Sequence, residues 1–284
     1  MEGTRRLPGP GRWAIEVWRG DAVRQAIGRS LGPGAVVAGR PGTPSPSWLA
    51  GLPFGPDQFF IGSASGALGI DDLPQLLETL LRELPPHVRR VYHYDASWLA
   101  PVGRAYLGQG FEEFVHRYSM QRRLPAASAP QQRLTLLPFI PERQEFFAET
   151  YGGCLVDCRS PMSLEDLGDP AAALAFQAAQ DHGPDGRRWY LGLLPDGQPA
   201  GMALLDRYGP APSDWVVSFL GTVADARGQG YGRELLLRAA AHATRAGARR
   251  LHLAVCQTNE PALGLYRSTG FRTEETYRVF RLAR

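Results

Sequence analysis

A short glycine-rich segment carries the clearest chemical signal in this sequence. Residues 223–239 read VADARGQGYGRELLLRA: an apolar run ends, glycines follow at alternate positions (Gly228, Gly230 and Gly232), and a helical pattern begins at once. Glycine lets an anion approach the backbone closely, and the amino end of a helix carries about half a positive charge. The segment therefore predicts a cradle for a pyrophosphate, at whose mouth Arg227 either adds a charged contact or simply packs.

The same segment does not match two familiar phosphate-binding motifs. Its spacing is G-x-G-x-G, and no acidic residue ends the next predicted strand at Val255-Cys256, so it is not a dinucleotide fingerprint. All 31 basic residues of the chain are arginine, which excludes a P-loop lysine and a Schiff-base lysine.

The composition is that of a chain with an ordinary hydrophobic core. Of 284 residues, 44% are hydrophobic, and the net charge of +3 is too small to predict nucleic-acid binding. Cys154 and Cys158 form a C-x3-C spacing with no second ligand pair, so no metal is expected. No apolar run approaches the roughly 18–20 residues that span a membrane, and the first residues lack a signal-peptide core. We expect a cytoplasmic protein without a membrane partner.

Periodicity predicts the elements that position the glycine segment. It lies between an apolar run at 215–223, expected as a central strand, and a helix over 232–246. Also expected in this half are strands at 133–139, 189–194, 199–208, 251–256 and 271–282, and helices at 141–151, 163–180 and 261–268. In the first half, weaker patterns predict strands at 13–18, 35–38, 59–61, 91–94 and from Phe111, and helices at 22–31, 73–84 and up to Leu107.

The two halves of the chain repeat each other at an offset of 160 residues. The identities, six in one ungapped window, are Arg89-Arg90 with Arg249-Arg250, Pro101 with Pro261, Tyr106 with Tyr266, and Gly110-Phe111 with Gly270-Phe271. The repeat predicts that both halves of the chain have the same fold, with a linker over 121–133, a stretch that contains small residues and two prolines. The alternative is coincidence in a chain of biased composition.

The surroundings of the glycine segment resemble the GNAT superfamily of N-acetyltransferases. Arg227, Gly230 and Gly232 fit its R/Q-x-x-G-x-G/A signature between a strand and a helix. After the strand LHLAVC, the closing half of the family pattern follows as Asn259, Ala262, Leu265-Tyr266 and Gly270-Phe271. The resemblance is specific over about 216–278, extends back to Arg133, and implies a mixed α+β fold.

The resemblance implies a role for individual residues. The strand end Gly221, Thr222 and Val223 would pair with the pantetheine arm of acetyl-CoA, and an amide near Val223 would polarise the thioester carbonyl. Asn259 would contact the cofactor arm. Tyr266 would protonate the leaving thiolate, or else is a core aromatic residue like its counterpart in the first half. The backbone amides that would hold the pyrophosphate are those of Arg227, Gly228, Gln229, Gly230, Tyr231 and Gly232.

Two parts of the site have more than one interpretation. The general base departs from the family pattern, and the acceptor site has two alternatives. The strand WVVSFLGTV lacks the glutamate that many members carry, so the base is water, a carboxylate elsewhere, or Asp214 beside the strand. Glu142, Glu145 and Glu149, interleaved with aromatic residues at 146, 147 and 151, suggest a pocket for a cationic amine. The alternative is a solvated acidic helix face.

The first half lacks the glycine cradle. In its place stands ALGIDD, residues 67–72, where Asp71-Asp72 would repel a pyrophosphate. We therefore expect an α+β protein of two GNAT-like domains, each a mixed, mostly antiparallel sheet flanked by helices: a degenerate one at 1–125 and a catalytic one at 131–284. The layout is similar, in architecture only, to that of mycothiol synthase.

The expected reaction transfers the acetyl group of acetyl-CoA to a primary amine of a small molecule. Attack would be direct, in a ternary complex, because no nucleophile is placed for an acyl-enzyme; Cys256, the nearest thiol, is expected in the core. The alternatives are an acyl-CoA-binding regulatory module without turnover and an acyltransferase for protein or peptide amines. A monomer or a homodimer is expected.

Overall fold

The structure is a computed structural model of the 284-residue chain. It describes residues 4–7, 15–19, 35–40, 47–63, 72–124, 132–164, 168–179, 187–208 and 211–284. The chain divides into two compact units. The first unit consists of Met1–His116 and Tyr277–Arg284, and the second of Arg117–Thr276.

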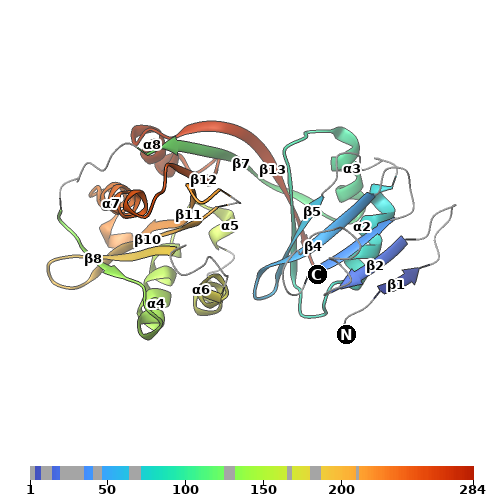
Figure 1. Ribbon diagram of the computed structural model, residues 1–284, viewed down its shortest axis with the longest axis horizontal. Coiled ribbons are helices and arrows are strands. Elements are labelled where there is room, and N and C mark those ends of the chain that lie inside the picture. The colour runs from blue at the N-terminus through green and yellow to red at the C-terminus, as the bar shows by residue number, and fades with distance from the viewer. Residues whose placement is uncertain are drawn as a thin grey trace. The chain divides into compact units, whose positions relative to one another are not determined.

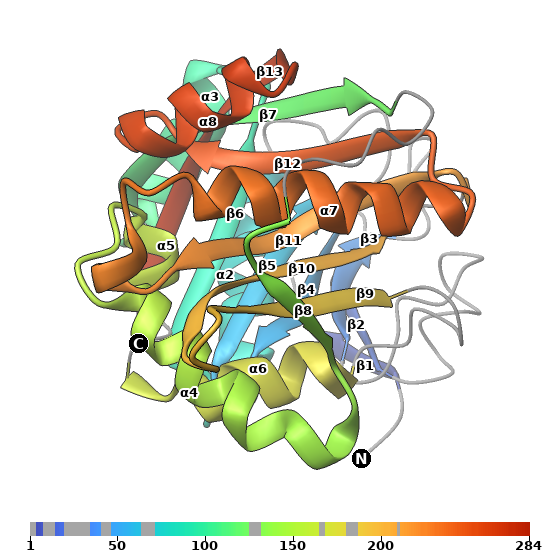
Figure 2. The ribbon, with the colours of Figure 1, turned by 90° about the vertical axis from the view of Figure 1, so that its left-hand side faces the viewer.

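The sheet of the second unit runs in the order β7–β12–β11–β10–β9–β8 (Figures 1 and 2). Neighbouring strands are antiparallel except for β11 and β12, which are parallel. The strands are β7 (Glu112–Arg123, in this unit from Arg117 on), β8 (Thr135–Pro138), β9 (Arg187–Leu193), β10 (Pro199–Arg207), β11 (Asp214–Thr222) and β12 (Arg250–Cys256).

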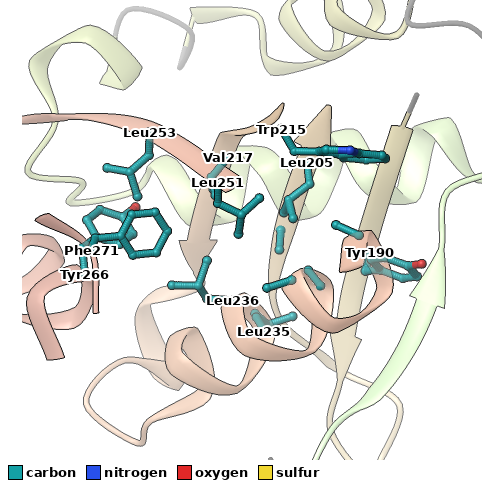
Figure 3. Close-up of a cluster of buried hydrophobic side chains, with 14 of the residues drawn as sticks. Tyr190, Leu205, Trp215, Val217, Leu235, Leu236, Leu251, Leu253, Tyr266 and Phe271 are labelled. Atoms are coloured by element: carbon teal, nitrogen blue, oxygen red, sulfur yellow. The ribbon is translucent and has the colours of Figure 1, made fainter. Parts of the chain in front are cut away.

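Helices cover both faces of this sheet. Helix α7 (Tyr231–Arg245) crosses one face, where its residues Leu235 and Leu236 enter a core with Trp215 (Figures 2 and 3). On the other face, Phe147 of α4 (Gln144–Leu155) and Leu174 of α6 (Pro170–Ala179) pack against the strands. Shorter elements are η1 (Pro141–Arg143), α5 (Pro161–Leu164), η3 (Ala224–Ala226) and α8 (Glu260–Ser268).

The first unit has a sheet of the same kind, in the order β1–β2–β3–β4–β5–β6–β13. Here β5 and β6 form the parallel pair, and the other neighbours are antiparallel. The strands are β1 (Thr4–Leu7), β2 (Ile15–Arg19), β3 (Val36–Arg40), β4 (Ser47–Gly55), β5 (Gln58–Ser63), β6 (Arg90–Asp95) and β13 (Arg272–Ala283, in this unit from Tyr277 on). Helices α2 (Leu73–Glu83) and α3 (Ala100–Gly108) contribute apolar residues to its core.

Each unit takes its last strand from the other half of the chain. In the second unit β7 pairs with β12 from Arg123 opposite Arg250, and in the first unit β13 pairs with β6 from Ala283 opposite Arg90. The two pairings are equivalent in the repeat, because Arg90 and Arg250 are 160 residues apart, as are Arg123 and Ala283. The compact units therefore differ from the contiguous division at 1–125 and 131–284, because β7 from Arg117 on and β13 from Tyr277 on are each counted with the opposite half.

The repeat also shows in local hydrogen bonds. After α3, the Phe111 amide donates to the Tyr106 carbonyl at 3.2 Å, and after α8 the Phe271 amide donates to the Tyr266 carbonyl at 3.0 Å. The intervening Gly110 and Gly270 have φ of 83° and 89°, a left-handed conformation that favours glycine. The two turns thus share both sequence and geometry.

The predicted fold class, α+β with mostly antiparallel sheets flanked by helices, is confirmed. Several element predictions differ from the structure: β1 and β4 were not expected, residues 121–123 belong to β7 rather than to a linker, and the helix expected at 163–180 is two described helices, α5 and α6. The single strand β13 replaces the several strands expected over 271–282. The helix expected at 22–31 lies outside the described residues, as does most of the ALGIDD segment.

Candidate active site

The parallel strands β11 and β12 separate partway along their length. They pair at Asp214 with Arg250, Trp215 with Leu251 and Val216 with His252, and no further pair joins them in the described part of the chain. On its other side, β11 stays paired with β10 as far as Thr222. From about residue 217 onward, one edge of β11 is therefore open toward β12.

The open edge of β11 presents particular backbone groups. The Val223 amide donates to the Ala200 carbonyl of β10 at 3.1 Å, so it points away from the gap. Because backbone groups alternate in direction along an antiparallel strand, Leu220 and Thr222 turn their N–H and C=O toward the gap. The expected amide near Val223 that would face a thioester is therefore not that of Val223 itself, and the N–H groups of Leu220 and Thr222 stay candidates for this role.

The glycine segment forms an exposed loop at the end of β11. Gly228 and Gly230 have φ of 74° and 84°, and Gly230 is the N-cap residue of α7. The Ala226 and Arg227 amides bond within the loop, to the carbonyls of residues 223 and 224. For the amides of residues 228–232, in contrast, no partner is found among the described residues, so the predicted cradle begins at Gly228 rather than at Arg227. These N–H groups at a helix start are suited to an anion.

Arg227 braces the loop instead of reaching out of it. Its guanidinium donates to the carbonyls of Thr222 at 3.3 Å, Cys154 at 3.2 Å and Val156 at 2.5 Å. These bonds tie the end of β11 to the last turn of α4. Of the two roles expected for Arg227, packing at the mouth of the loop fits the geometry.

A second arginine, which the sequence did not single out, lies at the loop. The Arg133 guanidinium donates to the Gln229 carbonyl at 2.9 Å and lies over the Tyr231 ring at 4.6 Å. A Cβ on Gly230 would stand 3.2 Å from its Nη2. The buried Glu234 accepts from the Arg133 and Leu134 amides, both at 2.9 Å, which fixes the start of this segment against α7. Arg133 is 44% exposed and stands where it could meet an anion in the loop.

Tyr266 and Asn259 lie on α8 or at its start. Tyr266 is buried beside Leu253 and Phe271 (Figure 3), and burial raises the pKa of its phenol to about 12. The Asn259 side chain caps α8 by accepting from the Ala262 amide at 3.3 Å. A capping role thus occupies the oxygen of Asn259, whereas its amide nitrogen can still donate.

The three cysteines gather near this region from α4, the following loop and β12. The Ser160 amide donates to the Cys158 sulfur at 3.4 Å, and the Ser160 hydroxyl lies 3.7 Å from the Cys256 sulfur. Burial raises the pKa of the Cys154 thiol to about 12 and raises that of Cys158 as well. Such thiols are poor nucleophiles at neutral pH. In the described ranges, no group of three or more metal-ligating side chains occurs.

Asp214 is not placed to act as a base at the gap. It lies at the first residue of β11, inside the strand, and forms a bidentate pair with Arg250 at 2.8 and 2.9 Å. The hydrogen bond from Arg250 holds the pKa of Asp214 below its usual value. Its position at the paired end of the strand separates it from residues 220–223.

The acidic residues of η1 and α4 line one groove. Glu142, Glu145 and Glu149, together with Pro170 and Ala171 of α6, surround a cavity of about 810 Å³. The expectation that aromatic residues line it is wrong for Phe147 and Tyr151, which point into the core. Gly152 also lines the groove, and a Cβ added to its neighbour Gly153 would stand 3.3 Å from the Val223 side chain.

Comparisons with known proteins agree with this geometry. Residues 150–271 match the model described as the acetyltransferase (GNAT) family. A GCN5-related N-acetyltransferase from Sphaerobacter thermophilus superposes with a TM-score of 0.64 at 19% identity, covering 93% of this chain and 84% of its own. A GCN5-related N-acetyltransferase from Kribbella flavida superposes with a TM-score of 0.59 at 18% identity, covering 82% of this chain and 86% of its own. A tandem GNAT protein from the clavulanic acid biosynthesis pathway superposes with a TM-score of 0.57 at 14% identity, covering 97% of this chain and 84% of its own.

A search of curated protein sequences returned no match. The structural likeness shows the fold, and the family model covers the gap, the glycine loop and α8. Residues 150–271 therefore match the GNAT acetyltransferase family, and the chain shares its fold with the N-acetyltransferase structures compared above. No described helix is long and apolar enough to cross a membrane.

Proposed function

We propose that the second unit binds acetyl-CoA along the open edge of β11 and transfers the acetyl group to a primary amine of a small molecule. One observation carries the proposal: a glycine loop at the start of α7 follows directly on a strand separated from its parallel neighbour. Leu220 and Thr222 would bond the amide-bearing pantetheine arm as an added strand does. The N–H groups of residues 228–232 would hold the diphosphate.

The chemistry proposed is direct transfer. The neutral amine nitrogen attacks the thioester carbonyl carbon, the carbon–sulfur bond breaks, and Tyr266 gives its proton to the sulfur. The nitrogen loses one proton as it becomes an amide, and a proton from solvent restores the Tyr266 phenol. Because burial raises the pKa of Tyr266 to about 12, its phenol keeps that proton throughout the neutral range. An amide of Leu220 or Thr222 would polarise the carbonyl, as a fixed N–H donor does in an oxyanion hole.

The acidic groove between α4 and α6 supports an amine acceptor. Three glutamates line it, and an ammonium group is their electrostatic complement. Gly152 lines the groove, and a Cβ added to the next residue, Gly153, would stand 3.3 Å from the Val223 side chain. An acceptor with a second cationic group would place that group in the groove and its reactive nitrogen toward the gap.

Calorimetric titration of acetyl-CoA tests the cofactor site. We expect one site per chain, and we expect Gly230→Asp to weaken binding at least about tenfold, since a carboxylate would enter the anion cradle. Gly197→Asp is the matched control: Gly197 has a φ of 85°, close to that of Gly230, but lies in the β9–β10 hairpin turn with open space around it.

The same proteins then test turnover. A panel of primary alkylamines is incubated with acetyl-CoA, and the released thiol is measured. We expect transfer by the wild type and by Gly197→Asp. Equal affinity in Gly230→Asp and the wild type would contradict the loop assignment, and tight binding without turnover of any amine would favour a binding module instead.

A further inference from the structure

A buried carboxylate on β10 stands directly behind an exposed hydroxyl on β11. The Ser218 Oγ donates to Asp206 Oδ2 at 2.6 Å and lies 3.1 Å from the Leu204 carbonyl oxygen. Asp206 is only 3% exposed, whereas Ser218 is exposed. The pair therefore connects the protein surface to a carboxylate that solvent does not reach directly.

A β-bulge explains why Ser218 can reach Asp206. Opposite Leu204 and Leu205 of β10 stand Phe219 and Val217, so Ser218 is the extra residue of the bulge. A bulge of this kind turns two consecutive side chains to one face. Accordingly, the Phe219 ring contacts Tyr151 of α4 on that face, with ring centroids 4.6 Å apart, and Ser218 bonds to Asp206 there.

The surroundings of Asp206 hold it in place and supply charge. Its Oδ1 accepts from the Trp189 indole N–H of β9 at 2.8 Å, and the Arg187 Nε, also on β9, lies 3.7 Å away. Arg187 is itself held by the carbonyls of residues 177 and 178 of α6. This carboxylate is thus oriented with Oδ2 toward Ser218.

The position along β11 relates this pair to the transfer site. Ser218 comes two residues after Val216, the last residue of β11 that pairs with β12, and two before Leu220, whose N–H faces the gap. At about 3.4 Å per residue, the Cα atoms of Ser218 and Leu220 are about 7 Å apart along the strand. This is the strand on which the expected glutamate is missing.

We propose that Ser218 and Asp206 form the proton relay that deprotonates the acceptor amine. The inference rests on the proposed function. The ammonium of the acceptor gives one proton to the Ser218 oxygen while the hydroxyl proton passes to Asp206 Oδ2, which leaves a neutral amine, an intact serine and a protonated carboxyl. The proton returns to solvent by the same path after the acetyl group has moved. Ser218 touches the acceptor, and Asp206 acts through it.

The test compares two nucleophiles that differ in their need for a base. An alkylamine is protonated at neutral pH and must lose a proton, whereas hydroxylamine is neutral there. We expect Ser218→Ala to lower kcat/KM for the fastest alkylamine of the panel about 100-fold at pH 7, with the deficit closing as the pH approaches the pKa of that amine. The hydroxylamine rate and the calorimetric affinity for acetyl-CoA should not change.

Two further variants and one control complete the test. Ser218→Thr keeps the hydroxyl and should keep most of the alkylamine activity, and Asp206→Asn should reproduce the pH-dependent defect. Ser213→Ala is the matched control, because its hydroxyl also contacts a carboxylate, that of Asp214 at 3.4 Å, at the opposite end of β11.

The outcomes separate the relay from the function on which it rests. A Ser218→Ala variant with the pH profile of the wild type overturns the relay and leaves acetyl transfer standing. A defect equal for alkylamine and hydroxylamine at every pH also overturns it, since that indicates structural damage. A wild type that turns over no alkylamine overturns the proposed function, and the relay with it.

Discussion

The phenol ring of Tyr106 stacks on the imidazole of His93, with 4.0 Å between the ring centroids and 5° between the ring planes. His93 also forms a hydrogen bond from Nδ1 to the Ile61 carbonyl at 2.9 Å, at the last parallel pair of β5 and β6. In the second unit the corresponding pairing ends one residue earlier, and Leu253 stands in the place of His93. The first unit thus holds a packed ring pair where the second unit has separated strands.

The two tyrosines related by the repeat should respond differently to loss of their hydroxyls. Tyr106 is 1% exposed and its hydroxyl finds no partner among the described residues, so Tyr106→Phe should leave stability unchanged or raise it by about 1 kcal/mol. Activity should not change. Tyr266→Phe should lower kcat about 100-fold with unchanged affinity for acetyl-CoA, because the proton donor to the sulfur is lost.

Chemical denaturation, calorimetry and the thiol-release assay measure these effects on the full chain. An equal loss of activity in both variants would argue against a role for Tyr266 in proton transfer. Stoichiometry adds a second check. If the first unit also bound acetyl-CoA, two sites per chain would be found.

Arg133 should contribute to cofactor affinity although no family motif includes it. Its guanidinium stands beside Gly230 and is 44% exposed, so Arg133→Met should weaken acetyl-CoA binding about threefold to tenfold, with a smaller difference at high salt. Arg143→Met is the control, since Arg143 also donates to a backbone carbonyl, that of Pro138 at 2.8 Å, away from the loop. Titrations at low and high ionic strength decide between a charge effect and a loss of packing.

The local parts of the site could be predicted from sequence because their signals are local. An apolar run, alternate glycines and a 3.6-residue period mark β11, the loop and α7 without knowledge of any distant residue. The turn from Tyr266 to Phe271 is marked in the same way. In contrast, strand β4 was missed, since Gly51, Pro53 and Gly55 interrupt its pattern.

Contacts between distant residues escaped prediction for physical reasons. Ser218 reaches Asp206 only because of a bulge that no glycine or proline marks, and Arg133 reaches the loop through a carboxylate 101 residues away. The pairing of β7 and β13 with the sheet of the opposite half also had no local sequence signal. Both halves carry equivalent strands in equivalent registers, so nothing local distinguishes pairing within a half from pairing with the other half.

The exchange of the last strands predicts where a C-terminal substitution acts. Phe280 of β13 is fully buried in the core of the first unit, with Leu76, Leu77 and Tyr106. Phe280→Ala should therefore cost about 3–5 kcal/mol in that unit. Amide hydrogen exchange should speed up in α2 and β6, while peptides of β9 and β10 and the affinity for acetyl-CoA stay unchanged. Faster exchange confined to the second unit would contradict the strand exchange.

The ion pair between Asp95 and Arg278 should make the stability of the first unit depend on pH. The two side chains are 3% and 13% exposed, and the Arg278 Nη2 lies 2.8 Å from Asp95 Oδ2. Burial raises the pKa of Asp95, but hydrogen bonds from Ser97 and Arg278 more than offset this effect and hold the pKa below its usual value. A carboxyl whose pKa is lower in the folded state stabilises the fold at any pH above its pKa in the unfolded chain. That contribution is lost as the pH falls through its pKa in the folded state. Acid unfolding of this unit should thus steepen below about pH 4.

Two variants distinguish this pair from general acid denaturation. Arg278→Met leaves a buried carboxylate without its cation and should destabilise the first unit by about 3–5 kcal/mol at pH 7, with a smaller deficit at pH 3, where Asp95 becomes protonated more easily. Arg281→Met is the comparison, since Arg281 pairs with the exposed Glu112 and should cost less than about 1 kcal/mol. Denaturation followed by exchange in β6 measures both variants. Equal costs at pH 7 and pH 3 for Arg278→Met would show that packing, and not the charge of Asp95, holds β13 in this sheet.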